Sequence, residues 1–154
     1  MLARNESRLA DAEKLFRRAQ TLAPNEPSVH IHFGQFLSET SRHEEAAEEY
    51  LRAAQLSPED HDVVFNAATS LREAGALDQA ERFYRKAVKL RPDDAASHMN
   101  LGAILHVNGK LHEAESSYLE SIRLRPNDET TRANLGKLYS LFRKQGLQPR
   151  QVIR

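Results

Sequence analysis

Small, aromatic and apolar side chains recur along this chain at a fixed interval of 34 residues. The clearest positions are a leucine and the proline two residues after it: Leu22, Leu56, Leu90 and Leu124, then Pro24, Pro58, Pro92 and Pro126. Others in phase are Ala12, Ala46, Ala80 and Ala114, the rings Phe16, Tyr50, Tyr84 and Tyr118, and the small residues Ala19, Ala53, Ala87 and Ser121. Several such columns, meaning sets of equivalent residues, predict a repeat protein whose units pack on their neighbours.

Each interval between prolines contains two helical stretches. In the first complete unit they are predicted over residues 28–41 and 43–56, and the turns inside successive units are Thr40-Ser41, Ala74-Gly75 and Asn108-Gly109. Proline ends the helix before it because it cannot continue the hydrogen-bond pattern. The polar pairs after the prolines are expected to cap the next helix: Asn25-Glu26, Glu59-Asp60, Asp93-Asp94 and Asn127-Asp128.

Glycine predicts where paired helices cross. Gly34 and Gly102 are expected opposite Ala46 and Ala114, so that the two backbones approach closely. The aromatic column is then expected to fill the gap between neighbouring units.

These columns resemble those of the tetratricopeptide repeat (TPR) family, which has the same period and a helix–turn–helix unit. The resemblance implies an all-α fold, a right-handed solenoid of antiparallel helix pairs. It divides residues 1–154, taken as a single array, into a partial unit 7–24, full units 27–60, 61–94 and 95–128, a terminal helix 129–143 and a tail 144–154. The column that often holds Trp in the family contains His30, Val64, His98 and Arg132, which predicts looser packing there. Ser41 and His43 also make the first turn atypical.

Composition and motifs argue against several functions. The 154 residues carry 22 basic and 22 acidic side chains, whereas a nucleic-acid surface needs a basic excess. We therefore expect no nucleic acid as a partner, and no direct membrane insertion, because no stretch approaches the ~20 apolar residues of a spanning helix. No cysteine is present to form a disulfide or a thiolate site. His43 and His112 each begin a zincin-like motif without its second histidine, so we expect no metal, no cofactor and no catalytic residue in this segment.

An asparagine column is the candidate binding feature. Asn66, Asn100 and Asn134 recur at the repeat interval, with His32 in the equivalent place of the first full unit. In TPR proteins this column faces the concave surface, and similar ladders line the TPR superhelix of O-GlcNAc transferase. A primary amide can bind both the N–H and the C=O of an extended peptide. The predicted peptide-binding residues are His32, Asn66, Thr69, Asn100, His106, Asn134 and Lys137. Alternatively, the amides only bond between adjacent first helices.

Neighbouring positions disfavour one TPR activity. The family members that clamp acidic peptide tails carry Lys and Asn on adjacent turns of the first unit, and here those places hold Ile31 and Gln35.

Residues 98–111 (HMNLGAILHVNGKL), 134–139 (NLGKLY) and 144–147 (KQGL) are similar to the C-terminal array of the transmembrane and TPR-containing O-mannosyltransferases. That resemblance implies a non-catalytic, lumenal substrate-recognition arm of an endoplasmic-reticulum membrane enzyme acting on cadherins. If it does not apply, a cytoplasmic adaptor is the expectation.

The two ends of the array suggest further partners. The chain starts inside a unit, which favours a fragment of a larger protein, because a repeat helix needs a neighbour. A third alternative is self-association, in which helices 7–20 and 129–143 stack on other copies.

Overall fold

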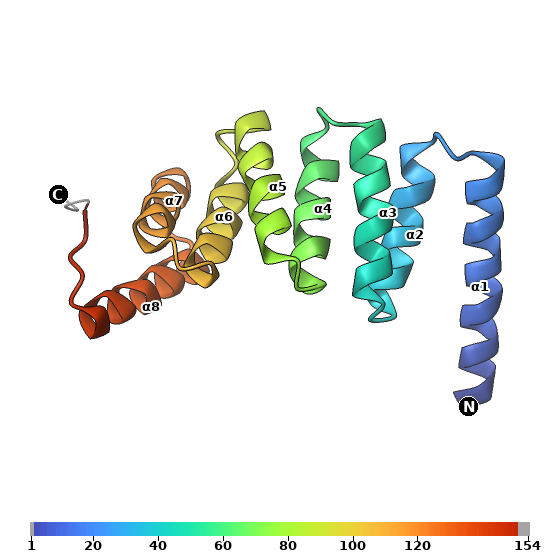
Figure 1. Cartoon of the computed structure of the whole chain (residues 1–154), viewed down its shortest axis with the longest axis horizontal. Coiled ribbons are helices and arrows are strands. Elements are labelled where there is room, and N and C mark those ends of the chain that lie inside the picture. Colours follow the sequence, from blue (N-terminus) through green and yellow to red (C-terminus); the bar gives the residue numbers. More distant parts are fainter. Residues whose placement is uncertain (1, 151–154) are drawn as a thin grey trace. The chain divides into compact units, whose positions relative to one another are not determined.

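The computed structural model describes residues 2–150, which form eight α-helices and no strand (Figure 1). In chain order they are α1 (Leu2–Leu22), α2 (Pro27–Glu39), α3 (His43–Leu56), α4 (His61–Glu73), α5 (Leu77–Leu90), α6 (Ala95–Val107), α7 (Leu111–Leu124) and α8 (Glu129–Gln145). The predicted all-α helix-pair fold is confirmed.

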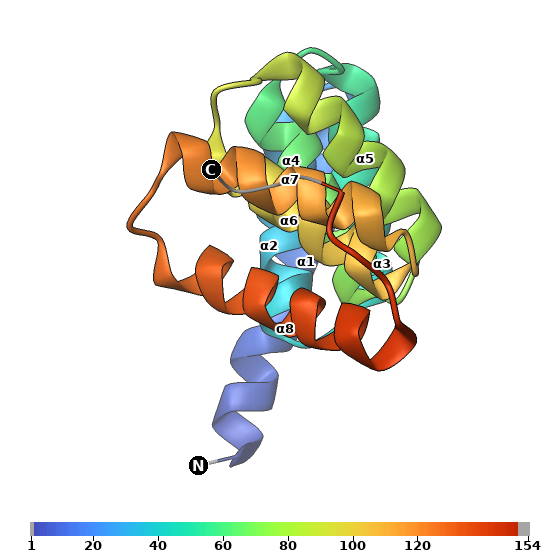
Figure 2. The ribbon, with the colours of Figure 1, turned by 90° about the vertical axis from the view of Figure 1, so that its left-hand side faces the viewer.

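The chain divides into two compact units, Met1–Gly75 and Ala76–Arg154. The first unit contains α1 to α4, and α2 packs with α3 and α3 with α4. In the second unit α5 packs with α6, α6 with α7, and α7 with α8 (Figure 2). Short turns join α2 to α3 and α6 to α7, so the two helices of each of these pairs run antiparallel. By sequence, α2, α4, α6 and α8 correspond to the first helix of a repeat, and α1, α3, α5 and α7 correspond to the second helix.

Three of the predicted helix caps are present. They are Asp60 on α4, Asp94 on α6 and Asp128 on α8. In the last of these, Asp128 Oδ1 accepts a hydrogen bond from the main-chain N–H of Thr130 at 3.0 Å. Glu26 forms no side-chain cap on α2, which starts instead with Pro27. Proline suits a first helical position because it lacks the N–H that a cap would satisfy.

The column that often holds Trp in the family has a specific role at the turns. Three of its side chains donate a hydrogen bond to the carbonyl oxygen of the proline six residues earlier. The bonds are His30 Nε2 to Pro24 O (2.7 Å), His98 Nε2 to Pro92 O (2.7 Å) and Arg132 Nε to Pro126 O (2.6 Å). His30 is 4% exposed and Val64, which has no donor, is 0% exposed. The predicted looser packing is therefore wrong at these two positions.

The paired helices cross at a glycine that faces an aromatic ring. A Cβ atom added to Gly34 would lie 3.0 Å from ring carbons of Tyr50, and one added to Gly102 would lie 2.7 Å from Cδ1 of Tyr118. Such distances leave no space for a side chain. These two rings therefore pack inside their own helix pair, where the sequence pattern had placed them between neighbouring units.

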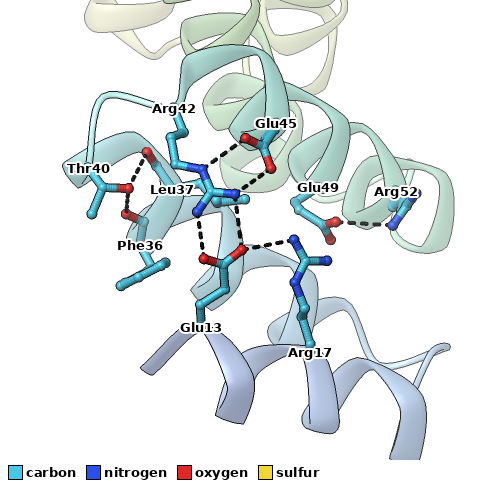
Figure 3. A network of polar contacts seen from close by, with 9 residues as sticks. All are labelled: Glu13, Arg17, Phe36, Leu37, Thr40, Arg42, Glu45, Glu49 and Arg52. Carbon is cyan, nitrogen blue, oxygen red and sulfur yellow. Dashed lines mark hydrogen bonds and ion pairs between the residues drawn. The ribbon is translucent and has the colours of Figure 1, made fainter. Parts of the chain in front are cut away.

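Ion pairs join one second helix to the start of the next second helix, and Figure 3 shows the one between Glu13 and Arg42. Glu13 on α1 accepts from Arg42, at the N-cap of α3, with Nη1–Oε2 of 2.7 Å and Nη2–Oε1 of 3.0 Å. Glu81 on α5 accepts from Lys110 Nζ, at the N-cap of α7, at 2.8 Å. The base follows the acid by 29 residues in both cases, so the same contact occurs at two places in the array; Ala47 interrupts the acidic column between them.

These bonds hold the carboxylates in their charged form. The hydrogen bonds from Arg42 lower the pKa of Glu13 to about 2, against the opposing effect of burial and with further help from Arg17. Burial alone would raise the pKa of Glu81, but hydrogen bonds from Lys110, Asn108 and Arg85 outweigh it and lower the pKa to about 2.

The lowered pKa of Glu81 predicts a stability change with pH. A carboxyl group whose folded pKa lies below its ordinary value of 4.5 stabilises the fold above that value and loses the effect as pH falls toward 2. Glu81→Gln should lower the free energy of unfolding at pH 7 by about 1–3 kcal/mol, because it breaks hydrogen bonds to charged groups. Urea unfolding at pH 3 should show a smaller difference from wild type. The exposed control Glu59→Gln should show little difference at either pH, and an unchanged Glu81 effect at pH 3 would contradict the assignment.

Ser41 provides a second stability prediction. It has a left-handed φ of 62°, where the equivalent turns have Gly75 at 82° and Gly109 at 78°. A residue with a Cβ atom pays roughly 1–2 kcal/mol in this conformation. We expect Ser41→Gly to raise the free energy of unfolding by about 1 kcal/mol in urea titration, and Gly75→Ser to lower it by a similar amount. Equal stability of Ser41→Gly and wild type would show that the serine is not strained.

Candidate peptide-binding surface

The asparagine column lies on the first helices α2, α4, α6 and α8. In the unit Met1–Gly75, His32 and Asn66 are both exposed. In the unit Ala76–Arg154, Asn100 and Asn134 are half-buried, and their helices α6 and α8 contact each other. None of these three amides is buried, so each of them reaches the surface of its own unit.

The hydrogen bonds of these amides differ. Asn100 Nδ2 donates to the main-chain oxygen of Ala96, one turn earlier in the same helix, at 2.8 Å. Within residues 2–150, the side chains of Asn66 and Asn134 form no hydrogen bond with the protein. An amide in this state still has both its donor and its acceptor groups to offer a ligand.

Two of the other predicted residues lie one turn from an asparagine. Thr69 is half-buried on α4, three residues after Asn66, and its Oγ1 donates to the main-chain oxygen of Phe65 at 3.2 Å. Lys137 is exposed on α8, three residues after Asn134. Residues three apart share a helix face, so the structure brings each of these pairs together. The result is one polar patch on α4 and one on α8.

His106 is the remaining predicted residue. It is half-buried near the end of α6, six residues beyond Asn100 and therefore not its immediate neighbour on the helix. Burial lowers the pKa of His106, so the ring is neutral at pH 7. A neutral imidazole donates from one nitrogen and accepts at the other, which matches the alternating groups of a peptide main chain.

Among residues 2–150, no cluster of three His, Cys, Asp or Glu side chains has the arrangement needed to hold a metal ion. Nor does any helix in that part of the chain have the length and apolar character to cross a membrane.

Comparison with known proteins identifies the family. Residues 1–61 and 65–129 match the family model described as tetratricopeptide repeat. The chain belongs to the TPR family.

Two curated relatives share a short part of the TPR sequence. The protein O-mannosyl-transferase Tmtc1 of Drosophila melanogaster is 59% identical over 44 residues, which are 29% of this chain and 5% of Tmtc1. Tmtc2 of the same organism is 55% identical over 42 residues, 27% of this chain and 4% of Tmtc2. The matched segment thus spans about a twentieth of the length of these relatives.

Solved TPR structures have the same fold at low sequence identity. MamA has a TM-score of 0.80 at 15% identity, covering 94% of this chain and 82% of MamA. YrrB, described as a TPR protein with an unusual peptide-binding site, has 0.78 at 20% identity, covering 94% and 74%. The first TPR of Spaghetti (RPAP3), bound to the HSP90 peptide SRMEEVD, has 0.72 at 21% identity, covering 77% and 94%. These likenesses establish the fold.

Sequence reasoning missed one group of polar residues in this TPR chain. After α8, residues 147–150 run back along α7 (Figure 2), where His112 Nε2 donates to Gln148 O at 3.0 Å and Glu115 Oε1 accepts from the N–H of Arg150 at 3.1 Å. Glu115 belongs to the same column as Glu13 and Glu81. The interval of 34 residues from Glu81 to Glu115 was the signal that could have marked Glu115 as part of a polar contact.

Proposed function

We propose that this TPR chain is a non-catalytic module that binds an extended polypeptide through the first helices of its units. The observation that carries the proposal is that Asn66, Asn100 and Asn134 recur at the repeat interval and remain at the surface. Each of the two compact units contributes its own residues. The first contributes His32, Asn66 and Thr69, and the second contributes Asn100, His106, Asn134 and Lys137.

The chemistry suits a ligand that is recognised by its main chain. A carboxamide donates to a peptide C=O and accepts from a peptide N–H, so one asparagine can bind one peptide group whatever its side chain. Each such hydrogen bond contributes about 1 kcal/mol net. A flexible ligand loses conformational entropy on binding, so we expect an affinity in the micromolar range or weaker.

The surface does not favour a strongly acidic ligand. Ile31 is apolar, and Gln35 Nε2 donates to Glu39 on the same helix at 3.2 Å. Among the predicted binding residues Lys137 is the one lysine or arginine, and burial lowers the pKa of His106, which favours its neutral ring. We therefore propose a ligand that is mostly uncharged, unlike the acidic peptide bound to Spaghetti.

A second proposal concerns the larger protein in which the module acts. The identity to Tmtc1 and Tmtc2 favours a substrate-recognition arm of an O-mannosyltransferase. In that case the module lies in the endoplasmic-reticulum lumen, a cadherin segment is its ligand, and glycosyl transfer takes place elsewhere in the polypeptide.

Replacing the three asparagines separates binding from stability. We expect Asn66→Ala, Asn100→Ala and Asn134→Ala together to weaken peptide binding by about a hundredfold or more, since each replacement removes at least one bond that contributes about 1 kcal/mol. The thermal midpoint should change little, because none of the three side chains is buried. The probes are fluorescein-labelled peptides tiled along a cadherin ectodomain, with uncharged Ser/Gly/Ala peptides of equal length, measured by fluorescence anisotropy.

A matched triple variant provides the control. Asn5→Ala, Asn25→Ala and Asn127→Ala remove three exposed asparagines outside the column and should leave the affinity unchanged. Loss of thermal stability without loss of affinity in the column variant would show that the amides are structural. Binding of the uncharged peptides alone would favour a general adaptor over the cadherin-specific arm.

A further inference from the structure

A pocket of about 410 Å³ opens between α1, α2 and α3 in the unit Met1–Gly75. Its lining residues come from these three helices and from the turn after α1, and they are Arg17, Gln20, Thr21, Pro24, His30 and Arg52. Arg17 and Gln20 lie roughly 140–200° around α1 from the exposed Leu15. The pocket is therefore on the side of α1 that faces α2 and α3, and the contacts among these three helices form it.

A buried polar cluster, consisting of Gln20, His30 and Glu49, forms the base of the pocket. Glu49 Oε2 accepts a hydrogen bond from Gln20 Nε2 and lies 2.8 Å from His30 Nδ1. Glu49 Oε1 accepts from Arg52 Nη1 at 3.0 Å. Glu49 is only 6% exposed, and both of its oxygens have partners. Its negative charge is thus balanced within the cluster.

The stacking of repeats does not require polar residues at these three positions. In the next repeat the equivalent residues are apolar: Ala54, Val64 and Phe83. Ala54 and Val64 are buried. Burial of polar and charged groups costs free energy that their hydrogen bonds must offset, so an apolar set serves the stack equally well. We therefore attribute the polar cluster to a function of the pocket.

Two arginines at the mouth of the pocket have donors that are not yet used. Arg52 donates to Glu49, and Arg17 donates from Nη2 to Glu13 Oε1 at 2.8 Å (Figure 3). Each side chain forms only this one hydrogen bond within residues 2–150, although a guanidinium has five N–H groups. The side chains of Arg17 and Arg52 are 57% and 55% exposed. Their remaining N–H groups are available to a ligand.

The contacts that these arginines already form hold them in place. The guanidinium carbon of Arg17 lies 5.5 Å from the centre of the Phe33 ring, in a cation–π contact. Glu49 holds Arg52 from inside the protein. A ligand that binds these groups therefore orders few additional side-chain torsions, which reduces the entropy lost on binding.

We propose that this pocket binds the phosphate group of a phosphate monoester through Arg17 and Arg52. Guanidinium groups from two different helices can donate to separate oxygens of a tetrahedral anion, whereas a planar carboxylate matches a single guanidinium. A pocket of about 410 Å³ also leaves room for the organic group that carries the phosphate. The ligand is thus an anion with a tetrahedral head.

This site is separate from the proposed peptide-binding surface. His32, the predicted peptide-binding residue on α2, follows His30 by two residues, which is about 200° around the helix. His30 is buried at the pocket and His32 is exposed. The variant that lacks the three column asparagines should therefore bind phosphate as the wild type does, so the two proposals can fail independently.

Titration of the full chain with inorganic phosphate near neutral pH, at constant ionic strength, tests the proposal. The ¹H–¹⁵N NMR signals of the Arg17 and Arg52 side chains should shift, with a Kd of about a millimolar or tighter. Arg17→Gln and Arg52→Gln should each weaken binding about tenfold or more, because each removes hydrogen bonds to a charged group. Arg18→Gln, which removes the same charge from the next exposed residue of α1, should have little effect. Circular dichroism of each variant checks that the helices remain folded.

Three further probes identify the ligand more closely. Glycerol 3-phosphate carries the phosphate on a small metabolite, and the peptide Gly-Gly-phosphoserine-Gly-Gly carries it on a polypeptide, so the tighter of the two names the source. Acetate should bind about tenfold more weakly than phosphate or worse, because it matches one arginine. Equal affinities for acetate and phosphate would overturn the proposal. So would failure of both esters to bind, or equal phosphate affinities of Arg52→Gln and Arg18→Gln.

Discussion

The close approach of two helices at a glycine is the contact on which the pairs α2–α3 and α6–α7 depend. At Gly34 and Gly102 the ring of a tyrosine takes the volume that a side chain would occupy, and this fixes which face of the first helix is buried. The asparagine column precedes the glycine column by two residues, which is about 200° around a helix. Where that small residue is buried, as are Ala68 on α4 and Gly102 on α6, the asparagine lies on the opposite side of the helix. The packing of the core and the exposure of the amides have the same cause.

Polar contacts at the helix ends then fix each helix relative to the next within a unit. Aspartates cap three of the first helices, proline carbonyl oxygens accept from side chains one to two turns later, and Glu13 and Glu81 bind the bases that begin the following second helices. None of these contacts involves Asn66, Asn100 or Asn134. The surface proposed for ligand binding can thus change its side chains without loss of the contacts that support it.

Much of the fold could be predicted because the repeat makes each position visible several times. The prolines, the aspartate caps and the glycines follow directly from backbone chemistry at fixed positions. Glu26 did not cap its helix, because Pro27 removed the need for it. The position of the tyrosine rings inside each pair depends on the angle at which helices cross, which spacing alone does not define. The sequence could place asparagines on first helices, but their exposure and the 2.8 Å bond from Asn100 to Ala96 depend on side-chain rotamers. Residues 147–150 have no repeat equivalent, so the sequence could mark Glu115 through its column but could not show that this segment contacts it.

The bonds from His30, His98 and Arg132 to proline oxygens have a consequence for how such repeats diverge. What the turn requires is an N–H group that reaches a carbonyl, and imidazole and guanidinium both supply one. An indole does so as well. Trp, His and Arg can therefore replace one another at this position while the proline oxygen keeps its hydrogen bond. Val64 has no donor, and its side chain is completely buried instead. Distant units that have lost the tryptophan of this position can be recognised by a ring or guanidinium donor six residues after a helix-ending proline.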